Sequence, residues 1–179
     1  MLRKYLRQFI LPWDDLLAVF SGRKFARALD VGAGTGLVLE TLYAHNIIAQ
    51  GIGVEVNGKY FRKINDDVVI IDAKELDGDS FDLIIFFDVL HHVHNKDAFI
   101  SYYLKMLRKG GTVLVKEMDN RNLIYTYYNK LHDLIMAREL IEEISPEALE
   151  RRLPDFQVAA RGRKRIFLYD HYWRIFQAK

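Results

Sequence analysis

Residues 28–40 read ALDVGAGTGLVLE, and this stretch decides the fold. Glycine stands at every second position from Gly32 to Gly36, between an apolar run over 26–31 and a segment whose leucines have helical spacing. Glycine inside a strand or helix costs about 0.5–1 kcal/mol relative to alanine, so three glycines this close together need a physical reason. Either the chain turns sharply here or another group comes close to the backbone. The stretch therefore predicts a strand, a glycine loop and a helix, in that order.

The same alternation of strand and helix continues along the chain. Apolar runs bounded by turn residues predict four further strands, over 49–56, 67–73, 81–90 and 112–118. Helical spacing predicts helices over 36–46, around 59–64 and over 95–111, with Asn95 as the N-cap of the last and Gly110 and Gly111 as its stop. Several strands are apolar on both faces, which is typical of a parallel sheet covered by helices on both sides.

The two ends of the chain complete this pattern. At the N-terminus it predicts two short helices split at Pro12. Further helices are predicted over 122–144 and 145–153, the second with Ser145 as its N-cap and Pro146 at its first position. Closing strands are predicted over 156–161 and 172–179. The sequence contains no repeat or linker, so residues 1–179 are predicted to form a single domain, with N-terminal helices over 1–25 and a helical lid or insert over 119–153.

The composition excludes several kinds of chemistry. The chain has 179 residues, a formal net charge of +2 and no cysteine, so disulfides, thiolate metal sites and cysteine nucleophiles are excluded. The basic and apolar N-terminus is interrupted by Gln8 and Pro12, which argues against a signal peptide. The longest unbroken apolar run, 83–87, is too short for a membrane span. We therefore expect a soluble, cytoplasmic protein without a membrane partner.

Acidic side chains stand at the predicted strand ends, one for each strand. They are Asp30, Glu55, Asp72, Asp88 and Asp119. In a parallel sheet the ligand lies outside the carboxyl ends of the strands. Each acid alone is well explained as the N-cap of the next helix, but the set of five favours a ligand site. An acid at the end of the second strand, where Glu55 stands, binds the two hydroxyls of a ribose, so we expect a cofactor that contains a nucleoside.

The glycine spacing narrows the choice of cofactor. A dinucleotide-binding loop has the pattern G-x-G-x-x-G, and Leu37 stands where its third glycine would be. The spacing here is G-x-G-x-G, which suits a smaller ligand without a pyrophosphate, and it argues against a nicotinamide dehydrogenase. A phosphate-binding G-K-[S/T] sequence is also missing, because Leu37 and Val38 follow the last glycine.

At this point the sequence resembles a known family, the class I S-adenosylmethionine-dependent methyltransferases. The resemblance is carried by five motifs in the family's order: LDVGAGTG (29–36), GIGVEV (51–56), IIDA (70–73), FDLIIFFDVLHHV (81–93) and LRKGGTVLVKE (107–117). It covers residues 28–118, about half of the chain. It implies a Rossmann-like, doubly wound α/β fold with a mostly parallel seven-stranded sheet and a C-terminal antiparallel hairpin.

The resemblance also implies S-adenosyl-L-methionine as the cofactor and assigns residues to it. The methionine part would contact Asp30, Gly32, Ala33, Gly34, Gly36, Asp88 and Val89, the ribose would contact Glu55 and Val56, and the adenine would contact Asp72 and Ala73. Transfer of a methyl group from a sulfonium requires mainly that the two reactants are close and correctly oriented. The lack of a catalytic dyad in the sequence therefore does not argue against an enzyme. We therefore expect a methyltransferase whose catalytic residues the sequence does not name.

The acceptor is less well defined than the cofactor. Family members that methylate nucleic-acid amines carry an Asn/Asp-Pro-Pro-aromatic stretch after the fourth strand, and this chain has Asp88-Val89-Leu90 there, which favours a small molecule. Arg163, Arg165 and His171, expected in a basic loop between the closing strands, are the candidate acceptor-binding residues. Two alternatives stay open: an RNA methyltransferase that uses this basic loop, and an inactive scaffold that only binds the cofactor.

Two further groups of side chains have a structural interpretation that we prefer. His91, His92 and His94 could suggest a metal site, but no fourth ligand accompanies them, so we expect no metal. The predicted long helix carries Tyr125, Tyr127, Tyr128 and His132. Because this helix occupies the place of the family's substrate lid, some of them could face the acceptor, but their helical spacing with leucine and isoleucine favours the core.

Overall fold

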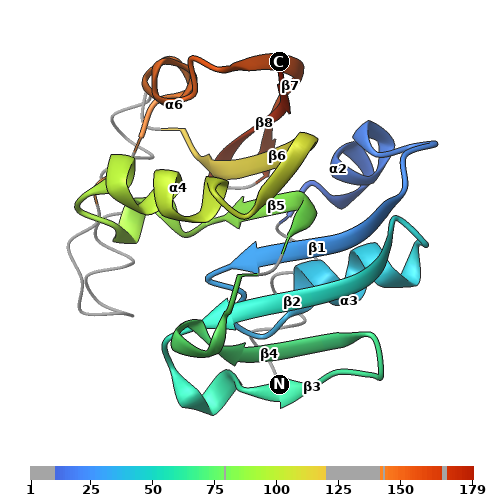
Figure 1. The fold of residues 1–179 in the computed structure, drawn as a ribbon. Helices are drawn as coiled ribbons and strands as arrows, with labels where there is room; N and C mark the ends of the chain where they lie inside the picture. The colour runs from blue at the N-terminus through green and yellow to red at the C-terminus, as the bar shows by residue number, and fades with distance from the viewer. Residues whose placement is uncertain (1–10, 79, 120–141, 143, 167–168) are drawn as a thin grey trace.

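The computed structural model describes residues 11–78, 80–119, 142, 144–166 and 169–179 (Figure 1). These residues form one twisted sheet with helices on both of its faces. Within them, no helix has the length and apolar character that crossing a membrane requires. The predicted helix over 122–144 and its tyrosines lie almost wholly outside the described residues, as does the first of the two predicted N-terminal helices.

The sheet has eight strands in the order β3-β4-β2-β1-β5-β6-β8-β7. The strands are β1 (Phe25–Val31), β2 (Ile48–Glu55), β3 (Arg62–Lys63), β4 (Val68–Asp72), β5 (Phe81–Phe87), β6 (Leu107–Met118), β7 (Phe156–Ile166) and β8 (Tyr169–Ala178). Strands β4, β2, β1, β5 and β6 are parallel, whereas β8 runs antiparallel to both β6 and β7. The predicted Rossmann-like, mostly parallel sheet with a C-terminal hairpin is confirmed, with β3 as one additional short strand.

Alternate residues of the central strands serve two separate cores, one on each face of the sheet. Ala28 and Leu83 belong to the core under α2 (Trp13–Val19) and α3 (Leu37–Ala44). Their neighbours Leu29 and Ile84 belong to the core under α4 (Lys96–Leu104) and α6 (Pro146–Arg152). Successive residues of a strand point to opposite faces of the sheet. Because both faces are buried here, these strands need no alternation between apolar and polar residues.

One predicted helix and the end of another are wrong. The segment 59–64 is a short 3₁₀ turn, Gly58–Tyr60, followed by β3, because Asn57 accepts a hydrogen bond from Lys59 N and starts a tight turn. The helix after Asn95 ends at Leu104 instead of at the glycine pair. The chain then pairs Leu107 with Phe81, so Gly110 and Gly111 lie inside β6. The caps themselves are confirmed, since Asn95 accepts from Ala98 N and Ser145 from Ala148 N.

An ion-pair cluster ties α6 to the C-terminal hairpin. The Glu150 carboxylate on α6 accepts hydrogen bonds from Arg161 on β7 at 2.9 and 3.1 Å and from Arg174 on β8 at 2.7 Å. The hydrogen bond from Arg161, followed by that from Arg174, lowers the pKa of Glu150 to about 2 against partial desolvation, which raises it. One helix and two strands are thus joined at a single carboxylate.

This lowered pKa predicts a pH-dependent contribution to stability. Because the folded pKa of Glu150 lies below its unfolded value, the contribution is complete above the unfolded pKa of about 4.3 and is lost as the pH falls toward 2. Glu150→Gln should therefore lower the free energy of unfolding at pH 6 to 7, and its difference from the wild type should disappear between about pH 4.3 and pH 2. Urea unfolding at several pH values measures this difference. A difference that stays constant over the whole range would contradict the assignment.

Candidate functional site

The glycine loop between β1 and α3 has a backbone that side chains would strain. Gly32, Gly34 and Gly36 have φ values of +74°, +51° and +73°, in the left-handed region that favours glycine. A Cβ atom on Gly32 would lie 2.5 Å from Val89 Cγ2, and one on Gly36 would lie 2.6 Å from the side chains of Ile64 and Ile70. The loop therefore needs its glycines both for the turn and for the close approach of other parts of the protein.

The loop is held at the carboxyl edge of the sheet by the neighbouring strand β2. The backbone N–H groups of Gly32 and Ala33 donate to Val54 O at 2.9 and 3.1 Å. Glu55, the last residue of β2, accepts from Gly34 N through Oε2 at 3.0 Å and from Val56 N through Oε1 at 2.8 Å. Its carboxylate is only partly buried, and Val56 beside it is 84% exposed. A carboxylate next to an exposed apolar side chain can accept from hydroxyl groups of a ligand that also has a flat apolar part.

Asp72 and Ala73 lie at the same edge, one strand further out. Asp72 is opposite Glu55 in the register of β2 and β4. Its side chain accepts from Lys74 N at 3.0 Å and caps the 3₁₀ turn Ala73–Glu75. This is the capping role that any one of the strand-end acids could have without a ligand. The contact of Asp72 with an adenine therefore remains a prediction.

Buried charges gather where β1, β5 and β6 end. Asp30 is 1% exposed and contributes, with Gly32, Ala33 and Phe87, to the lining of a small pocket. Asp88 follows β5 with a φ of +51°, uncommon for a residue with a side chain. Its Oδ1 lies 2.6 Å from Nζ of the fully buried Lys116. The predicted placement of these acids at the strand ends is confirmed, whereas their contacts with a cofactor are not tested by the structure.

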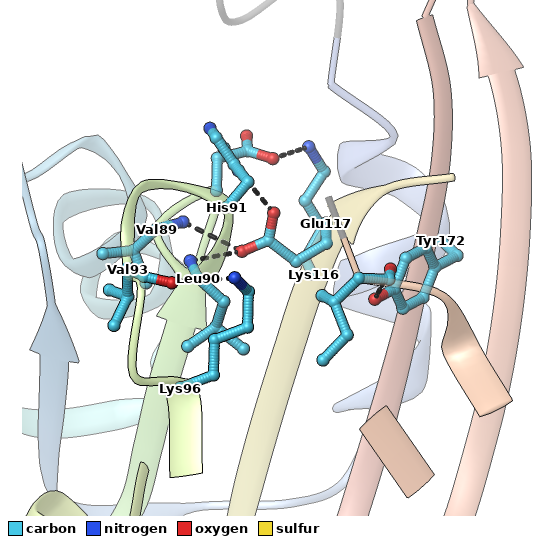
Figure 2. A network of polar contacts seen from close by, with 10 residues as sticks. Val89, Leu90, His91, Val93, Lys96, Lys116, Glu117 and Tyr172 are labelled. Atoms are coloured by element: carbon cyan, nitrogen blue, oxygen red, sulfur yellow. Dashed lines mark hydrogen bonds and ion pairs between the residues drawn. The ribbon is translucent and has the colours of Figure 1, made fainter. Parts of the chain in front are cut away.

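A second network at this edge has Glu117 at its centre (Figure 2). Glu117 Oε1 accepts from Val89 N at 3.0 Å and from Leu90 N at 2.7 Å, and Oε2 lies 2.6 Å from His91 Nδ1. Glu117 is not among the site residues predicted from the sequence. The available signal was the pair Lys116-Glu117 directly after the apolar residues 113–115, because charges in a strand that is buried on both faces need partners.

The predicted basic loop of the hairpin is a strand. β7 extends to Ile166 and β8 begins at Tyr169, so Arg163 and Arg165 lie in β7 and His171 lies in β8. The strands are longer than predicted because the pairing continues up to Ile166 opposite Tyr169. The hairpin does turn at the carboxyl edge, because β7 runs in the same direction as β6.

The arginines of this hairpin face carboxylates of the chain itself. Arg163 donates two hydrogen bonds to Asp170, at 2.9 and 2.6 Å, and its Nε lies 3.3 Å from Asp119 Oδ2. Arg165 lies 3.5 Å from Asp170, and His171 is buried. These contacts favour a structural role for both arginines, and their assignment to an acceptor stays a prediction.

The described residues hold no group of three or more side chains suited to a metal ion. His91 is buried against Glu117, and the ring of the exposed His92 lies 4.1 Å from the ring of His91. His91 therefore has a carboxylate partner, and His92 lies against the ring of His91.

Comparison with known sequences identifies a family over most of the chain. A family model described as "Methyltransferase domain" matches residues 3–159. The ubiquinone biosynthesis O-methyltransferase of Agrobacterium fabrum is 30% identical over 141 residues, which are 70% of this chain and 56% of that protein. The protein of the same name from Rhizobium etli is 26% identical over 167 residues, 83% of this chain and 67% of that protein. The chain thus spans between about half and two thirds of the length of these relatives.

Solved structures show the same fold at low sequence identity. A Haloferax volcanii methyltransferase, solved in complex with the activator Trm112, aligns with a TM-score of 0.78 at 12% identity, over 98% of this chain and 92% of that one. The magnesium protoporphyrin IX methyltransferase of Synechocystis with bound SAH aligns with a TM-score of 0.69 at 16% identity, over 99% of this chain and 84% of that one. At such identities the likeness concerns the fold.

Proposed function

The chain belongs to the methyltransferase domain family, and we propose that it transfers the methyl group of S-adenosylmethionine to a small-molecule acceptor. The observation that carries this proposal is the contact between Glu55 and the glycine loop, where the carboxylate lies 3.0 Å from Gly34 N. At the carboxyl edge of the sheet, this contact places an acid of the kind that binds ribose hydroxyls beside a glycine-rich loop.

The residues present fit this cofactor. The loop backbone carries no side chain at its three left-handed glycines, and Glu55 is partly exposed with two acceptor oxygens. We assign the ribose to Glu55 and Val56 and the adenine to Asp72 and Ala73. The methionine part is assigned to Asp30, Gly32, Ala33, Gly34, Gly36, Asp88 and Val89. When bound, S-adenosylmethionine supplies a methyl group on a positively charged sulfur, so the chain's own residues have mainly to orient the two reactants.

A hydroxyl oxygen of a small molecule is the acceptor that the comparisons favour. The two relatives described above are named O-methyltransferases. RNA is less favoured, because the arginines that would attract its phosphates lie against Asp170 and Asp119. The proposal for this chain is therefore an O-methyltransferase of a small molecule.

Glu55→Ala tests the cofactor site. Two hydrogen bonds from ribose hydroxyls to a carboxylate are worth about 1.5–3 kcal/mol each, so the affinity for S-adenosylmethionine should fall at least about tenfold. Isothermal titration calorimetry measures the affinity. Glu147→Ala, which removes an exposed carboxylate from α6, is the matched control and should bind as the wild type does. Equal affinities of the folded Glu55→Ala variant and the control would remove the ribose assignment.

A further inference from the structure

Two consecutive residues of β6 hold the chain at the point where it leaves β5. Lys116 O accepts from Asp88 N at 2.9 Å, and Lys116 Nζ lies 2.6 Å from Asp88 Oδ1. Glu117 Oε1 accepts from the next two backbone N–H groups, those of Val89 and Leu90 (Figure 2). Successive strand residues point to opposite faces of the sheet, so the two side chains hold this turn from its two sides.

Glu117 takes the place of a local cap for the short 3₁₀ turn Leu90–His92. The first N–H groups of a helical turn have no partner within the turn, and the residue before this one, Val89, has no side-chain acceptor for them. Leu90 is fully buried and Glu117 is 1% exposed, so water has no ready access to these groups. The geometry of the turn therefore depends on a carboxylate that is 27 positions away in the sequence.

The turn contacts the glycine loop through Val89. A Cβ atom on Gly32 would lie 2.5 Å from Val89 Cγ2 and 3.1 Å from Val89 Cβ, so the valine side chain packs directly on the glycine backbone. Asp88, Val89 and Gly32 are all among the residues assigned to the methionine part of the cofactor. Glu117 is not among them, and it is connected to them by the backbone of the turn.

We propose that Glu117 is a positioning residue for the methionine part of S-adenosylmethionine. It holds the turn so that Val89 rests on the glycine loop and Asp88 stays at the strand end. This inference rests on the proposed function and deepens it, because it adds a residue that sets cofactor affinity through other residues. The adenosine part is assigned to the ends of β2 and β4, which lie on the other side of β1 from β5. A disturbance of the turn should therefore act on the methionine part alone.

Two ligands separate the two parts of the cofactor. S-adenosylhomocysteine, which remains after methyl transfer, carries the amino-acid part, and methylthioadenosine has the same adenosine and sulfur without it. Glu117→Leu should weaken S-adenosylhomocysteine binding at least about tenfold and methylthioadenosine binding by less than about twofold, where tenfold corresponds to about 1.4 kcal/mol. Isothermal titration calorimetry of the folded variant measures both affinities. An equal loss for the two ligands, or no loss for either, overturns the proposal.

Two further variants separate positioning from general loss of stability. Glu117→Gln keeps a side-chain oxygen that can accept from Val89 N and Leu90 N, so it should retain most of the wild-type affinity for S-adenosylhomocysteine. Glu150→Leu is the matched control, because Glu150 also accepts three hydrogen bonds but joins α6 to the hairpin. It should be less stable than the wild type and bind both ligands normally. A selective loss in Glu150→Leu, or a loss in Glu117→Gln as large as that in Glu117→Leu, contradicts the proposal.

Hydrogen exchange tests the same coupling in the wild type, without any substitution. A ligand that binds better when the turn is held must also favour the held turn, because coupling between two equilibria is reciprocal. The amides of Val89 and Leu90 should therefore exchange more slowly with S-adenosylhomocysteine bound than with methylthioadenosine bound, both at saturation. Equal exchange with the two ligands overturns the proposal.

Failure of this inference and failure of the proposed function give different results in the calorimeter. Glu55→Ala should weaken both ligands, because both carry the ribose. A wild type that binds neither ligand refutes the proposed function and this inference with it. A wild type that binds both ligands, together with a folded Glu117→Leu variant that binds them equally well, refutes only the role of Glu117.

Discussion

Replacing Gly32 with alanine is expected to abolish S-adenosylmethionine binding while the fold survives. A Cβ at this position would lie 2.5 Å from Cγ2 and 3.1 Å from Cβ of Val89. A valine side chain is stiff at χ1 and cannot turn away at low cost, so the segment after β5 has to move. That segment and the glycine loop both contain residues assigned to the methionine part of the cofactor. We expect the affinity to fall by more than about a hundredfold, equivalent to about 2.7 kcal/mol.

Gly22→Ala is the matched control for the backbone conformation. Gly22 has a φ of +75°, almost the same as Gly32 at +74°, but nothing lies within 4 Å of the place that a Cβ atom would occupy there. In both variants an alanine must adopt a left-handed backbone conformation, which costs about 1–2 kcal/mol. Only Gly32→Ala adds the collision with Val89. Calorimetric titration should therefore show normal binding for Gly22→Ala. If both folded variants bind equally well, the cofactor does not lie against this loop.

Lys116→Met is expected to lower the free energy of unfolding by about 3–5 kcal/mol, because it removes the ammonium group that contacts the Asp88 carboxylate in a buried place. Lys116 is fully buried and Asp88 is 13% exposed, so water cannot easily replace the lost contact. Chemical denaturation of the cofactor-free protein measures the loss.

The double variant Lys116→Met/Asp88→Asn separates the charge from the packing. Asparagine tolerates the positive φ at position 88 and removes the negative charge from which Lys116→Met takes the ammonium group. The double variant should therefore be more stable than Lys116→Met alone. Surface substitutions usually change the free energy of unfolding by less than about 0.5 kcal/mol. If Lys116→Met alone stays within this range of the wild type, the pair of Lys116 and Asp88 does not contribute to stability.

The sequence predicted best what depends on local pattern. Apolar runs that are buried on both faces identified the parallel strands, and the alternating glycines identified the loop after β1. The capping residues Asn95 and Ser145 were also correct, because a cap acts within three residues of itself.

The errors arose where distant pairing overrides local preference. Gly110 and Gly111 look like the end of a helix, but pairing with β5 draws them into β6. Arg163 and Arg165 look like loop residues, but pairing with β8 extends their strand to Ile166. The contact between His91 and Glu117 joins residues 26 positions apart, which no local pattern indicates.

The central claim is that this chain moves a methyl group from S-adenosylmethionine to a small molecule. The most direct measurement incubates the purified chain with S-adenosylmethionine labelled in the methyl group and a fractionated cell extract, and then separates small molecules from protein and RNA. We expect label in the small-molecule fraction, and none there when Gly32→Ala replaces the wild type. Label in RNA or protein, or cofactor binding without any transfer of label, would contradict this claim.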